Sequence, residues 1–278
     1  MRRALAVVLL ALVACGCQAA ADGALRLPGR TVQLQVAPDN LATLWAVTSA
    51  GTYRSPDGGH TWFRVARIRT GWVTFTPTGS LFADGSRELL LAAPSGSGGF
   101  HGRLRAPAPF LSVSSPWYLS GRVYALDSTG GLWHSHDGGR HWRRSPGHGL
   151  PAGASDLVAA ASHRGKPDVL YVGDGAGGVY VSFDSGARFE RVARVNATSV
   201  AATPGWFGLL LIAGPDGLYR SSDSGRTLTR IPGVHGVQAL ALDPWNWRVA
   251  YATTTTGQLL RSFDGGEVWS PQAAGQGT

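Results

Sequence analysis

The octapeptide SPDGGHTW at residues 55–62 returns along the chain at regular intervals. Four further copies keep its Ser, its Asp and the Gly two residues after the Asp: SHDGGRHW at 135–142, SFDSGARF at 182–189, SSDSGRTL at 221–228 and SFDGGEVW at 262–269. The aspartates of the five copies are Asp57, Asp137, Asp184, Asp223 and Asp264. Their spacings of 80, 47, 39 and 41 residues indicate a period near 40, with one copy degenerate in the first interval.

Each residue type in the octapeptide suits a tight turn between two strands. An aspartate side chain accepts hydrogen bonds from backbone N–H groups of its own turn. The following glycine can take a positive φ without steric cost. The apolar side chain at the last position starts the next strand with a large surface to bury, and it is Trp62, Trp142, Phe189, Leu228 or Trp269. We therefore predict a structural role for the five aspartates.

The repeats predict an all-β fold. The degenerate copy is SGSGGFHG at 95–102, with Ser97 at the Asp position, so six repeats fill residues 31–270. Each repeat contains four short segments typical of strands, and four antiparallel strands repeated radially form a propeller blade. We expect a six-bladed β-propeller of four-stranded antiparallel blades. In each blade the octapeptide would form the hairpin turn between the third and the fourth strand, which we call the box hairpin. Seven blades are the less favoured alternative, because the longer interval between Asp137 and Asp184 has room only for an inserted loop.

The octapeptides resemble the Asp-box, also called the BNR repeat, S-x-D-x-G-x-T-W. This repeat is found in sialidases, sortilin-type receptors and photosystem II stability and assembly factors. The resemblance implies a β-propeller over nearly the whole chain after its N-terminal segment. It implies no single activity, because the same architecture serves many functions.

The N-terminus predicts export. Arg2 and Arg3 precede an apolar run over residues 4–14, which is typical of a signal peptide and too short to span a bilayer. Residues 12–15, LVAC, resemble a bacterial lipobox, so we expect a lipid on Cys15; cleavage of a plain secretory signal near residues 19–21 is the alternative. The expected organisation is a signal peptide at 1–14, a tether at 15–24 and one propeller domain at 25–278. The chain would then lie on the outer face of the bacterial cell membrane, or be secreted if the lipobox is not used.

The charge of the chain constrains its partners. It has 25 Lys and Arg against 17 Asp and Glu, a formal net charge of +8, and Lys166 is its only lysine. Outside the cytoplasm, anionic lipid headgroups, acidic wall polymers or an acidic protein are better counterparts for this charge than nucleic acid. No cysteine follows Cys17, so we expect the fold to rely on its core rather than on a disulfide.

Two sets of arginines are candidates for binding an anion or a partner. One set directly precedes the Ser of an octapeptide: Arg54, Arg220 and Arg261. The other lies two residues past the end of an octapeptide, where we expect an outer rim: Arg64, Arg144, Arg191 and Arg230. The alternative for both sets is that the side chains extend from the blade edges and pair with local carbonyl groups.

Large aromatic side chains occur in loops that are normally polar. They lie in the expected first-to-second strand loops SSPWYLSG, TPGWFG and DPWNW, and the set is Trp117, Trp206, Trp245 and Trp247. Such side chains either fold back under the blades as plugs or form an exposed patch for a partner.

An exo-sialidase-type glycoside hydrolase is the alternative function that the Asp-box resemblance raises. Its site, as the resemblance implies, needs three arginines, a tyrosine nucleophile activated by a glutamate, and an aspartate acid or base. The chain has three glutamates, of which Glu190 and Glu267 fall on an expected outer strand and in an octapeptide. Glu88 is thus a weak candidate, and we assign no catalytic residue.

The remaining motifs indicate no cofactor. The eight histidines show no metal-ligand spacing, and the glycine-rich GDGAGG at 173–178 precedes a strand rather than a helix, so it is no phosphate loop. The sequence therefore favours a membrane-anchored, non-catalytic binding or assembly scaffold for an extracytoplasmic protein or glycan, without metal, cofactor or nucleic acid. A glycan-binding module that uses the loop aromatics stays open.

Overall fold

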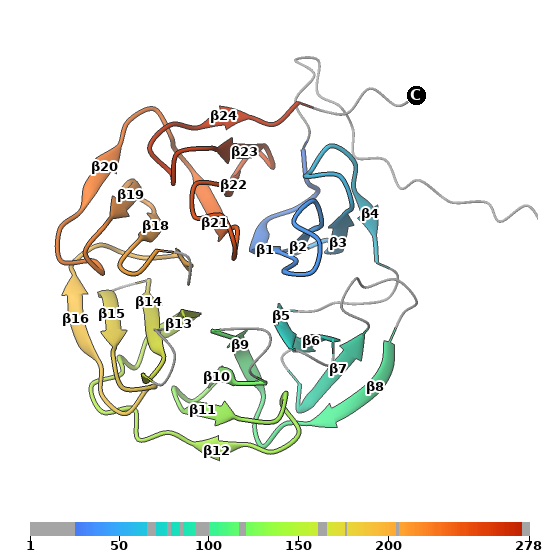
Figure 1. The fold of residues 1–278 in the computed structure, drawn as a ribbon, viewed down its shortest axis with the longest axis vertical. Coiled ribbons are helices and arrows are strands. Elements are labelled where there is room, and N and C mark those ends of the chain that lie inside the picture. Colours follow the sequence, from blue (N-terminus) through green and yellow to red (C-terminus); the bar gives the residue numbers. More distant parts are fainter. Residues whose placement is uncertain are drawn as a thin grey trace, which may run out of the picture.

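The computed structural model describes residues 26–273, apart from residues 66–70, 77–78, 84–85, 93–99, 117–120, 161–165, 176 and 204–205. Within these residues the chain forms six four-stranded antiparallel sheets, which stand as blades around a common centre (Figure 1). Each blade uses four consecutive strands, from the innermost to the outermost. The expected signal peptide and tether, with Cys15, lie outside the described residues.

The first three blades cover the N-terminal half of the ring. Blade 1 comprises β1 (Thr31–Val36), β2 (Leu44–Thr48), β3 (Gly51–Ser55) and β4 (Phe63–Arg64). Blade 2 comprises β5 (Trp72–Thr76), β6 (Gly79–Ala83), β7 (Glu88–Ala92) and β8 (Phe100–Arg105). Blade 3 comprises β9 (Phe110–Ser114), β10 (Val123–Asp127), β11 (Leu132–Ser135) and β12 (Arg143–Arg144).

The last three blades complete the ring (Figure 1). Blade 4 comprises β13 (Ala154–Ala160), β14 (Val169–Asp174), β15 (Gly178–Ser182) and β16 (Glu190–Ala193). Blade 5 comprises β17 (Ser199–Ala202), β18 (Leu210–Gly214), β19 (Gly217–Ser221) and β20 (Thr229–Ile231). Blade 6 comprises β21 (Val237–Leu242), β22 (Ala250–Thr254), β23 (Leu259–Ser262) and β24 (Ser270–Pro271).

The expectation of a box hairpin in every blade needs a correction, because residues 100–102 of the degenerate copy lie in β8 rather than in a turn. The structure describes this turn in five blades, not six: between β3 and β4, β11 and β12, β15 and β16, β19 and β20, and β23 and β24. In blade 2 the corresponding connection, with Ser97, lies outside the described residues. The alternative of a seventh blade is wrong, because residues 145–153 form a loop in which His148 pairs with Arg188 beside the turn of blade 4.

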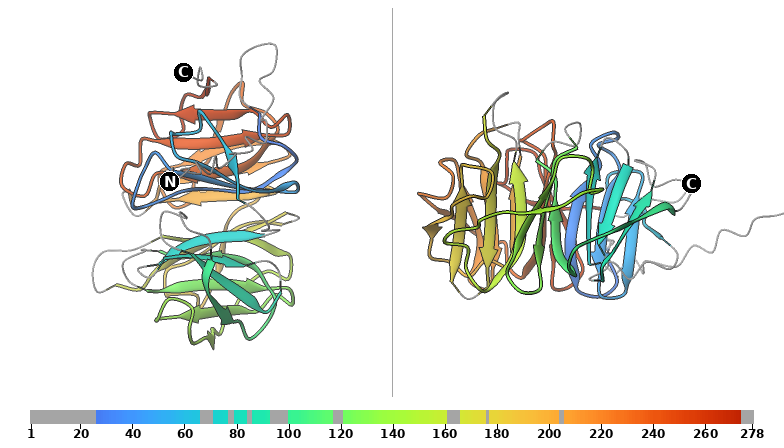
Figure 2. Two further views of the ribbon diagram at one scale, coloured as in Figure 1. Left: turned by 90° about the vertical axis from the view of Figure 1, so that its right-hand side faces the viewer. Right: turned by 90° about the horizontal axis from the view of Figure 1, so that it is seen from below.

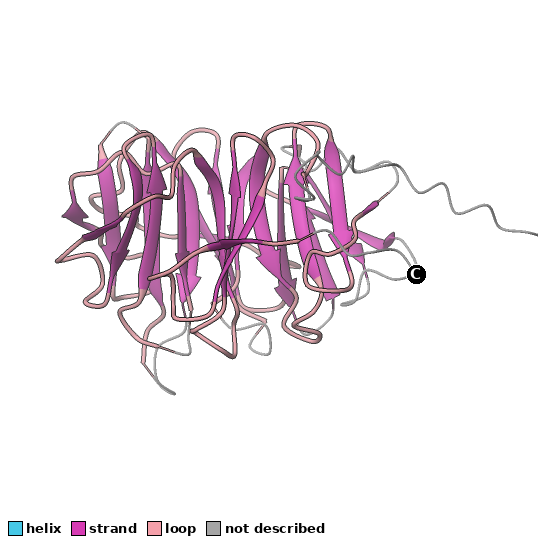
Figure 3. Cartoon of the chain, turned by 90° about the horizontal axis from the view of Figure 1, so that it is seen from above, coloured by secondary structure: helices cyan, strands magenta, loops and turns pink. Residues whose placement is uncertain are grey.

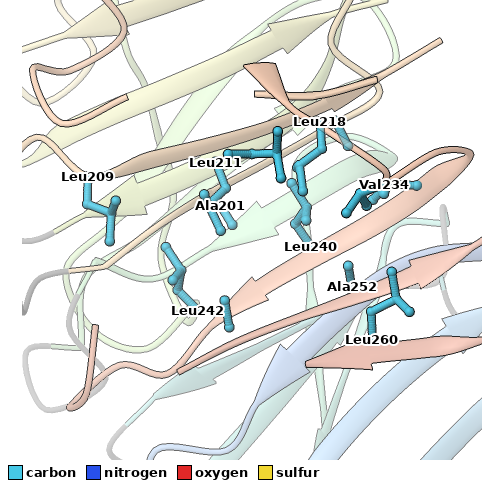
Figure 4. Packing of buried hydrophobic residues seen from close by; sticks show 13 residues of the cluster. Ala201, Leu209, Leu211, Leu218, Val234, Leu240, Leu242, Ala252 and Leu260 are labelled. Carbon is cyan, nitrogen blue, oxygen red and sulfur yellow. The ribbon is translucent and has the colours of Figure 1, made fainter. Parts of the chain in front are cut away.

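The hydrophobic core lies between neighbouring blades. At the junction of blades 5 and 6, Leu211 and Leu218 pack with Leu240, Ala252 and Leu260 (Figure 4). The inner strands of a blade are covered on both faces by the neighbouring blades. For this reason β2, β10, β18 and β22 are buried along their whole length. The segments LWAVT, VYALD, LLIAG and AYATT are accordingly apolar or small at nearly every position.

The blades have two distinct ends (Figure 3). At one end, the box turn bonds to the loop between the first and second strands: Gly58 N–H donates to Ala42 O at 2.6 Å, and Gly265 N–H to Arg248 O at 2.8 Å. We call this end the box face. The second-to-third strand loops and the connections between blades lie at the other end, the opposite face. Figure 2 shows the ring from the side, with the loops of the two faces at its two ends.

The ring closes between blade 6 and blade 1. Leu27 N–H donates to Gly257 O at 2.7 Å in the β22–β23 loop, and Gln272 Nε2 lies 2.8 Å from His60 Nε2. Because the β22–β23 loop belongs to the opposite face, the chain enters the ring from that face. No helix within the described residues is long and apolar enough to cross a membrane.

Candidate functional site

The box turns share one hydrogen-bond pattern. In blade 1, Ser55 Oγ donates to Asp57 Oδ1 at 2.7 Å and accepts the Gly59 N–H at 2.8 Å. The carboxylate of Asp57 also accepts the N–H and the hydroxyl of Thr61, at 2.8 and 2.6 Å. The Ser–Asp contact recurs at 2.7–2.8 Å in the other four described turns. These carboxylates are therefore directed into their own turns.

Hydrogen bonds also set the ionisation of the box aspartates. The Thr227 N–H has the largest effect on Asp223, followed by the hydroxyls of Thr227 and Ser221, and together they lower the pKa of Asp223 to about 2. At Asp57, partial burial acts to raise the pKa, but the bonds from Thr61 and Ser55 outweigh it and the pKa is lowered. Both carboxylates are ionised acceptors at neutral pH.

A cavity of about 90 Å³ lies at the centre of the ring, between the innermost strands of all six blades. The cavity extends to the box face. There it is lined by Pro38, Pro116 and Pro244, which follow the ends of β1, β9 and β21. The rest of its described lining is apolar or small, with Gln35 and a few hydroxyl side chains as its polar groups. The described lining contains no charged side chain and no tyrosine, which a sialidase-type centre would need.

Glu88 lies away from this cavity. It starts β7 at the opposite face, its side chain is 54% exposed, and its Oε2 is 3.3 Å from Arg103 Nη1. Arg103 belongs to the outermost strand of the blade, and its side chain is 73% exposed. The glutamate and its partner therefore form a surface ion pair at the rim, away from the central cavity.

Blades 5 and 6 bring two loop tryptophans together on the box face. The rings of Trp206 and Trp247 meet edge to face, with centroids 4.1 Å apart. Both are half-buried and pack against the core between the two blades. Trp247 also carries the Arg248 guanidinium over its ring, at 4.7 Å. These two tryptophans thus combine a plugging role with an edge at the surface.

Three further aromatic side chains in the box-face loops and turn of blades 5 and 6 are exposed to solvent. Phe207, Trp245 and Phe263 are 53%, 46% and 60% exposed. Trp245 is fixed by its Nε1–H, which donates to Pro38 O at 2.9 Å beside the central cavity. Phe263 lies in the blade 6 turn, with the Arg261 guanidinium 4.3 Å from its ring centroid. We call Trp206, Phe207, Trp245, Trp247 and Phe263 the box-face aromatic cluster. Of the four predicted aromatics, the structure brings Trp206 and Trp247 into contact and places Trp245 in the same loop as Trp247; Trp117 lies outside the described residues.

Among the arginines that precede the box serine, Arg220 reaches across to the next blade. Arg220 Nε donates to Gly265 O of blade 6 at 3.0 Å, and Arg220 Nη2 is 3.3 Å from Glu267 Oε1. Arg220 and Arg261 also cover aromatic rings of the cluster, Trp206 and Phe263 respectively. Arg54 Nε is buried without a hydrogen bond. Of these three arginines, Arg220 links blades 5 and 6, whereas the ring contacts of Arg261 stay within blade 6.

The outer-rim arginines are exposed and spread around the ring. Two of them pair with carbonyl groups of their own blade: Arg64 Nη2 donates to Ala50 O at 3.1 Å, and Arg230 Nη2 to Asp216 O at 2.9 Å. Each of these guanidinium groups lies over a glycine that starts the third strand, and a Cβ at Gly51 or Gly217 would approach Nε to 3.1 or 3.2 Å. This is the local pairing that the sequence left as the alternative.

Comparison with known proteins places the fold but no family. No family model and no curated protein matches the sequence. A solved structure of YCF48 bound to D1 peptide is similar, with 17% identity, a TM-score of 0.59 and coverage of 90% of this chain and 84% of that one. The fold is that of a β-propeller. YCF48 from Cyanidioschyzon merolae has 17% identity and a TM-score of 0.55, covering 88% of this chain and 86% of its own.

A glycoside hydrolase has the same fold. The GH74 xyloglucanase from Xanthomonas campestris has 19% identity and a TM-score of 0.62; the match covers 91% of this chain and 46% of the enzyme. The chain thus spans less than half of that enzyme. At these identities the likeness concerns the fold alone, and one architecture serves both a peptide-bound protein and an enzyme.

Sequence reasoning missed one of the five residues of the cluster. Phe207 follows Trp206 directly in the predicted aromatic loop TPGWFG, whereas Phe263 stands between the Ser and the Asp of the last octapeptide. A signal for Phe263 was present, because the position between Ser and Asp points outward in every turn of this kind and holds Pro56, His136 or Ser222 in three other copies. Within the described residues, no group of three or more His, Cys, Asp or Glu is placed to hold a metal.

Proposed function

We propose that the protein is a non-catalytic binding scaffold that holds a protein partner on its box-face aromatic cluster. The exposure of Phe207, Trp245 and Phe263 on a rigid framework is the observation that carries the proposal. Large aromatics that are both exposed and held in place are typical of interface hot spots, because their burial releases much apolar surface at little cost in side-chain entropy. The bound peptide in the similar YCF48 structure supports a partner of this kind.

The chemistry of the centre supports binding rather than catalysis. The cavity between the inner strands offers apolar and hydroxyl groups among its described residues, and Glu88 is paired with Arg103 at the rim. General acid–base catalysis needs a titratable group within hydrogen-bond reach of the reacting atoms. A small apolar cavity beside exposed aromatics suits an apolar side chain of a docked protein.

The proposed setting is the outer face of a bacterial cell membrane. Arg2, Arg3 and the apolar run after them support export, and the lipobox-like LVAC at 12–15 supports lipidation of Cys15. In this setting the partner is another extracytoplasmic protein.

Site-specific photocrosslinking in the cells that produce the protein tests the proposal. A benzophenone amino acid is placed at Phe263 or Phe207 in separate variants, and at Phe183 as the matched control. Phe183 occupies the same place between Ser and Asp in the turn of blade 4 and is 37% exposed, but it lies outside the cluster.

We expect one protein adduct of defined mass at positions 263 and 207 and none at 183. Phe207→Ser combined with Phe263→Ser should abolish an adduct formed from Trp245, while the folded protein persists at the wild-type level. Equal adducts at positions 263 and 183, or none at any position in the cluster, would overturn the proposal.

A further inference from the structure

We infer that the opposite face of the ring is a docking surface for an anionic lipid bilayer. Exposed arginines reach this face from the connections between blades, from the second-to-third strand loops and from the outermost strands. The side chains that define it are Arg26, Arg30, Arg64, Arg87, Arg194 and Arg230. The exposed carboxylates described at the same end are Asp216 and Glu88. We call this set of arginines the basic face.

The box face has a different balance of charge. Its exposed arginines include Arg140, Arg188 and Arg226, and each stands in an octapeptide a few residues after an ionised aspartate. Charges of both signs therefore alternate on the box face over distances shorter than the Debye length of about 10 Å at 0.1 M salt. On the opposite face the positive charge accumulates instead.

Two shallow hollows on the opposite face include arginine side chains in their lining. One, of about 390 Å³, is lined by Arg87, Arg103 and Arg105 together with Glu88. The other, of about 540 Å³, lies over Ala50 and Gly51 and includes Arg64. Guanidinium groups match phosphate oxygens in planar geometry and keep their charge at any physiological pH.

The path of the chain argues for a membrane rather than a soluble polyanion. Leu27 joins the ring through Gly257 of the opposite face, so a lipid on Cys15 would draw this same face toward the bilayer. The stretch from Cys15 to Arg26 can span at most about 40 Å, which confines the ring to the membrane surface. Charge attraction then orients the ring, since a lipid on Cys15 limits its distance from the membrane but does not by itself fix which face is turned to the lipid.

This orientation has a consequence for the binding scaffold. With the basic face on the lipid, the box-face aromatic cluster points away from the membrane. The membrane setting rests on the proposed function, whereas the affinity of the ring for anionic lipid can be measured without any partner.

Vesicle sedimentation tests the inference. The chain from residue 15 onward, with Cys15→Ser to prevent lipidation, retains every contact described here, because these lie within residues 26–273. It is mixed with vesicles of phosphatidylcholine alone, or with phosphatidylglycerol added, at low and at high salt. We expect binding to the anionic vesicles at low salt, its loss at high salt, and none to phosphatidylcholine.

Two matched triple variants locate the surface. Arg30→Ser, Arg87→Ser and Arg194→Ser remove three charges from the basic face, and Arg140→Ser, Arg188→Ser and Arg226→Ser remove three from the box face. The first variant should lose at least about tenfold in affinity for anionic vesicles, while the second should stay close to wild type, since each arginine near a charged surface contributes separately. Circular dichroism checks that both variants are folded.

Either of two results would overturn the inference. Equal losses in the two variants would mean that net charge acts without a face. Binding to polyphosphate or polyglutamate without binding to anionic vesicles would assign the basic face to a soluble polymer. The partner proposal is tested separately, because crosslinking at Phe263 concerns the other face of the ring.

Discussion

Asp156 on β13 accepts a hydrogen bond from the backbone N–H of Val200 on β17 at 2.7 Å, across the junction of blades 4 and 5. The carboxyl group is buried, and this burial raises its pKa to about 7 although Val200, Leu157 and Ser199 donate hydrogen bonds to it. Other junctions use neutral groups for the same purpose: the Ser112 and Ser114 hydroxyls accept the N–H groups of Leu157 and Ala159. An inter-blade contact that titrates near neutrality should make the stability of the ring depend on pH.

We predict that Asp156→Asn removes this dependence. The unfolded carboxyl titrates near 3.8 and the folded one near 7, so the folded state binds more protons between these values and wild-type stability falls as pH rises through that window. Asparagine keeps a carbonyl acceptor and does not titrate. Between pH 4 and pH 7, the unfolding free energy of the variant should rise relative to that of the wild type by about 1.4 kcal/mol for each pH unit. Urea unfolding at several pH values measures this, and a difference that does not vary with pH would contradict it.

Ser224 predicts an unusual order of two substitutions. It is buried, has φ of 65°, and its hydroxyl hydrogen-bonds to Tyr171 of the preceding blade. Both Ser224→Gly and Ser224→Ala lose this bond, but only glycine relieves the left-handed backbone. We expect Ser224→Ala to be less stable than Ser224→Gly by about 1 kcal/mol. Thermal unfolding of the two variants measures the difference, and an alanine variant as stable as the glycine variant would refute it.

The box aspartates should be stabilising. Asp223→Ala removes the acceptor of the Thr227 N–H, the Thr227 hydroxyl and the Ser221 hydroxyl. We expect a loss of about 1–3 kcal/mol in unfolding free energy at neutral pH. Because the folded pKa lies below the unfolded one, the contribution is present above about pH 4 and is lost as pH falls toward 2. Asp216→Ala, an exposed aspartate on the opposite face, is the control and should change little.

Arg220 should contribute to stability through its bond to the next blade. Arg220→Met loses the bond from Nε to Gly265 O and should cost about 1–2 kcal/mol. Glu267→Gln should cost less than about 0.5 kcal/mol, because the glutamate is 60% exposed and its ion pair is screened by solvent. Arg226→Met serves as the control, because Arg226 lies in the exposed turn that follows β19 in the same blade. A larger effect from Glu267→Gln than from Arg220→Met would reverse this assignment.

The protein should not release a fluorogenic aglycone from a panel of sialosides. Glu88 is the one carboxylate that the sequence offers for this chemistry, and it lies in a rim ion pair with Arg103. Glu88→Gln should therefore leave both stability and the null result unchanged. Hydrolysis by the wild type that is lost in Glu88→Gln would establish a glycosidase.

The repeat unit was predictable because its cause is local. The Ser, the Asp and the Gly of each octapeptide bond to one another within five residues, so the turn and its flanking strands can be inferred without knowing the rest of the fold. Contacts between blades were not predictable. The bond of Asp156 to Val200 and that of Arg220 to Gly265 join residues 44 and 45 positions apart, and nothing in the local sequence distinguishes these side chains from solvent-exposed ones.

The candidate site shows the same division. The loop positions of Trp206 and Trp247 followed from the repeat, but their edge-to-face contact depends on how blades 5 and 6 pack. Phe263 was hidden inside a motif whose other residues are structural. For Glu88, the sequence placed the residue on a loop but could not say that Arg103, from the neighbouring strand, lies beside it.

Every blade is made of four consecutive strands, and the ring closes through Leu27, His60 and Gln272 rather than by a strand borrowed from the other end of the chain. Duplication or deletion of about 40 residues between two equivalent turns would therefore add or remove one whole blade without leaving an unpaired strand. Chains of this design can change their number of blades by simple recombination, and the width of the central opening changes with it.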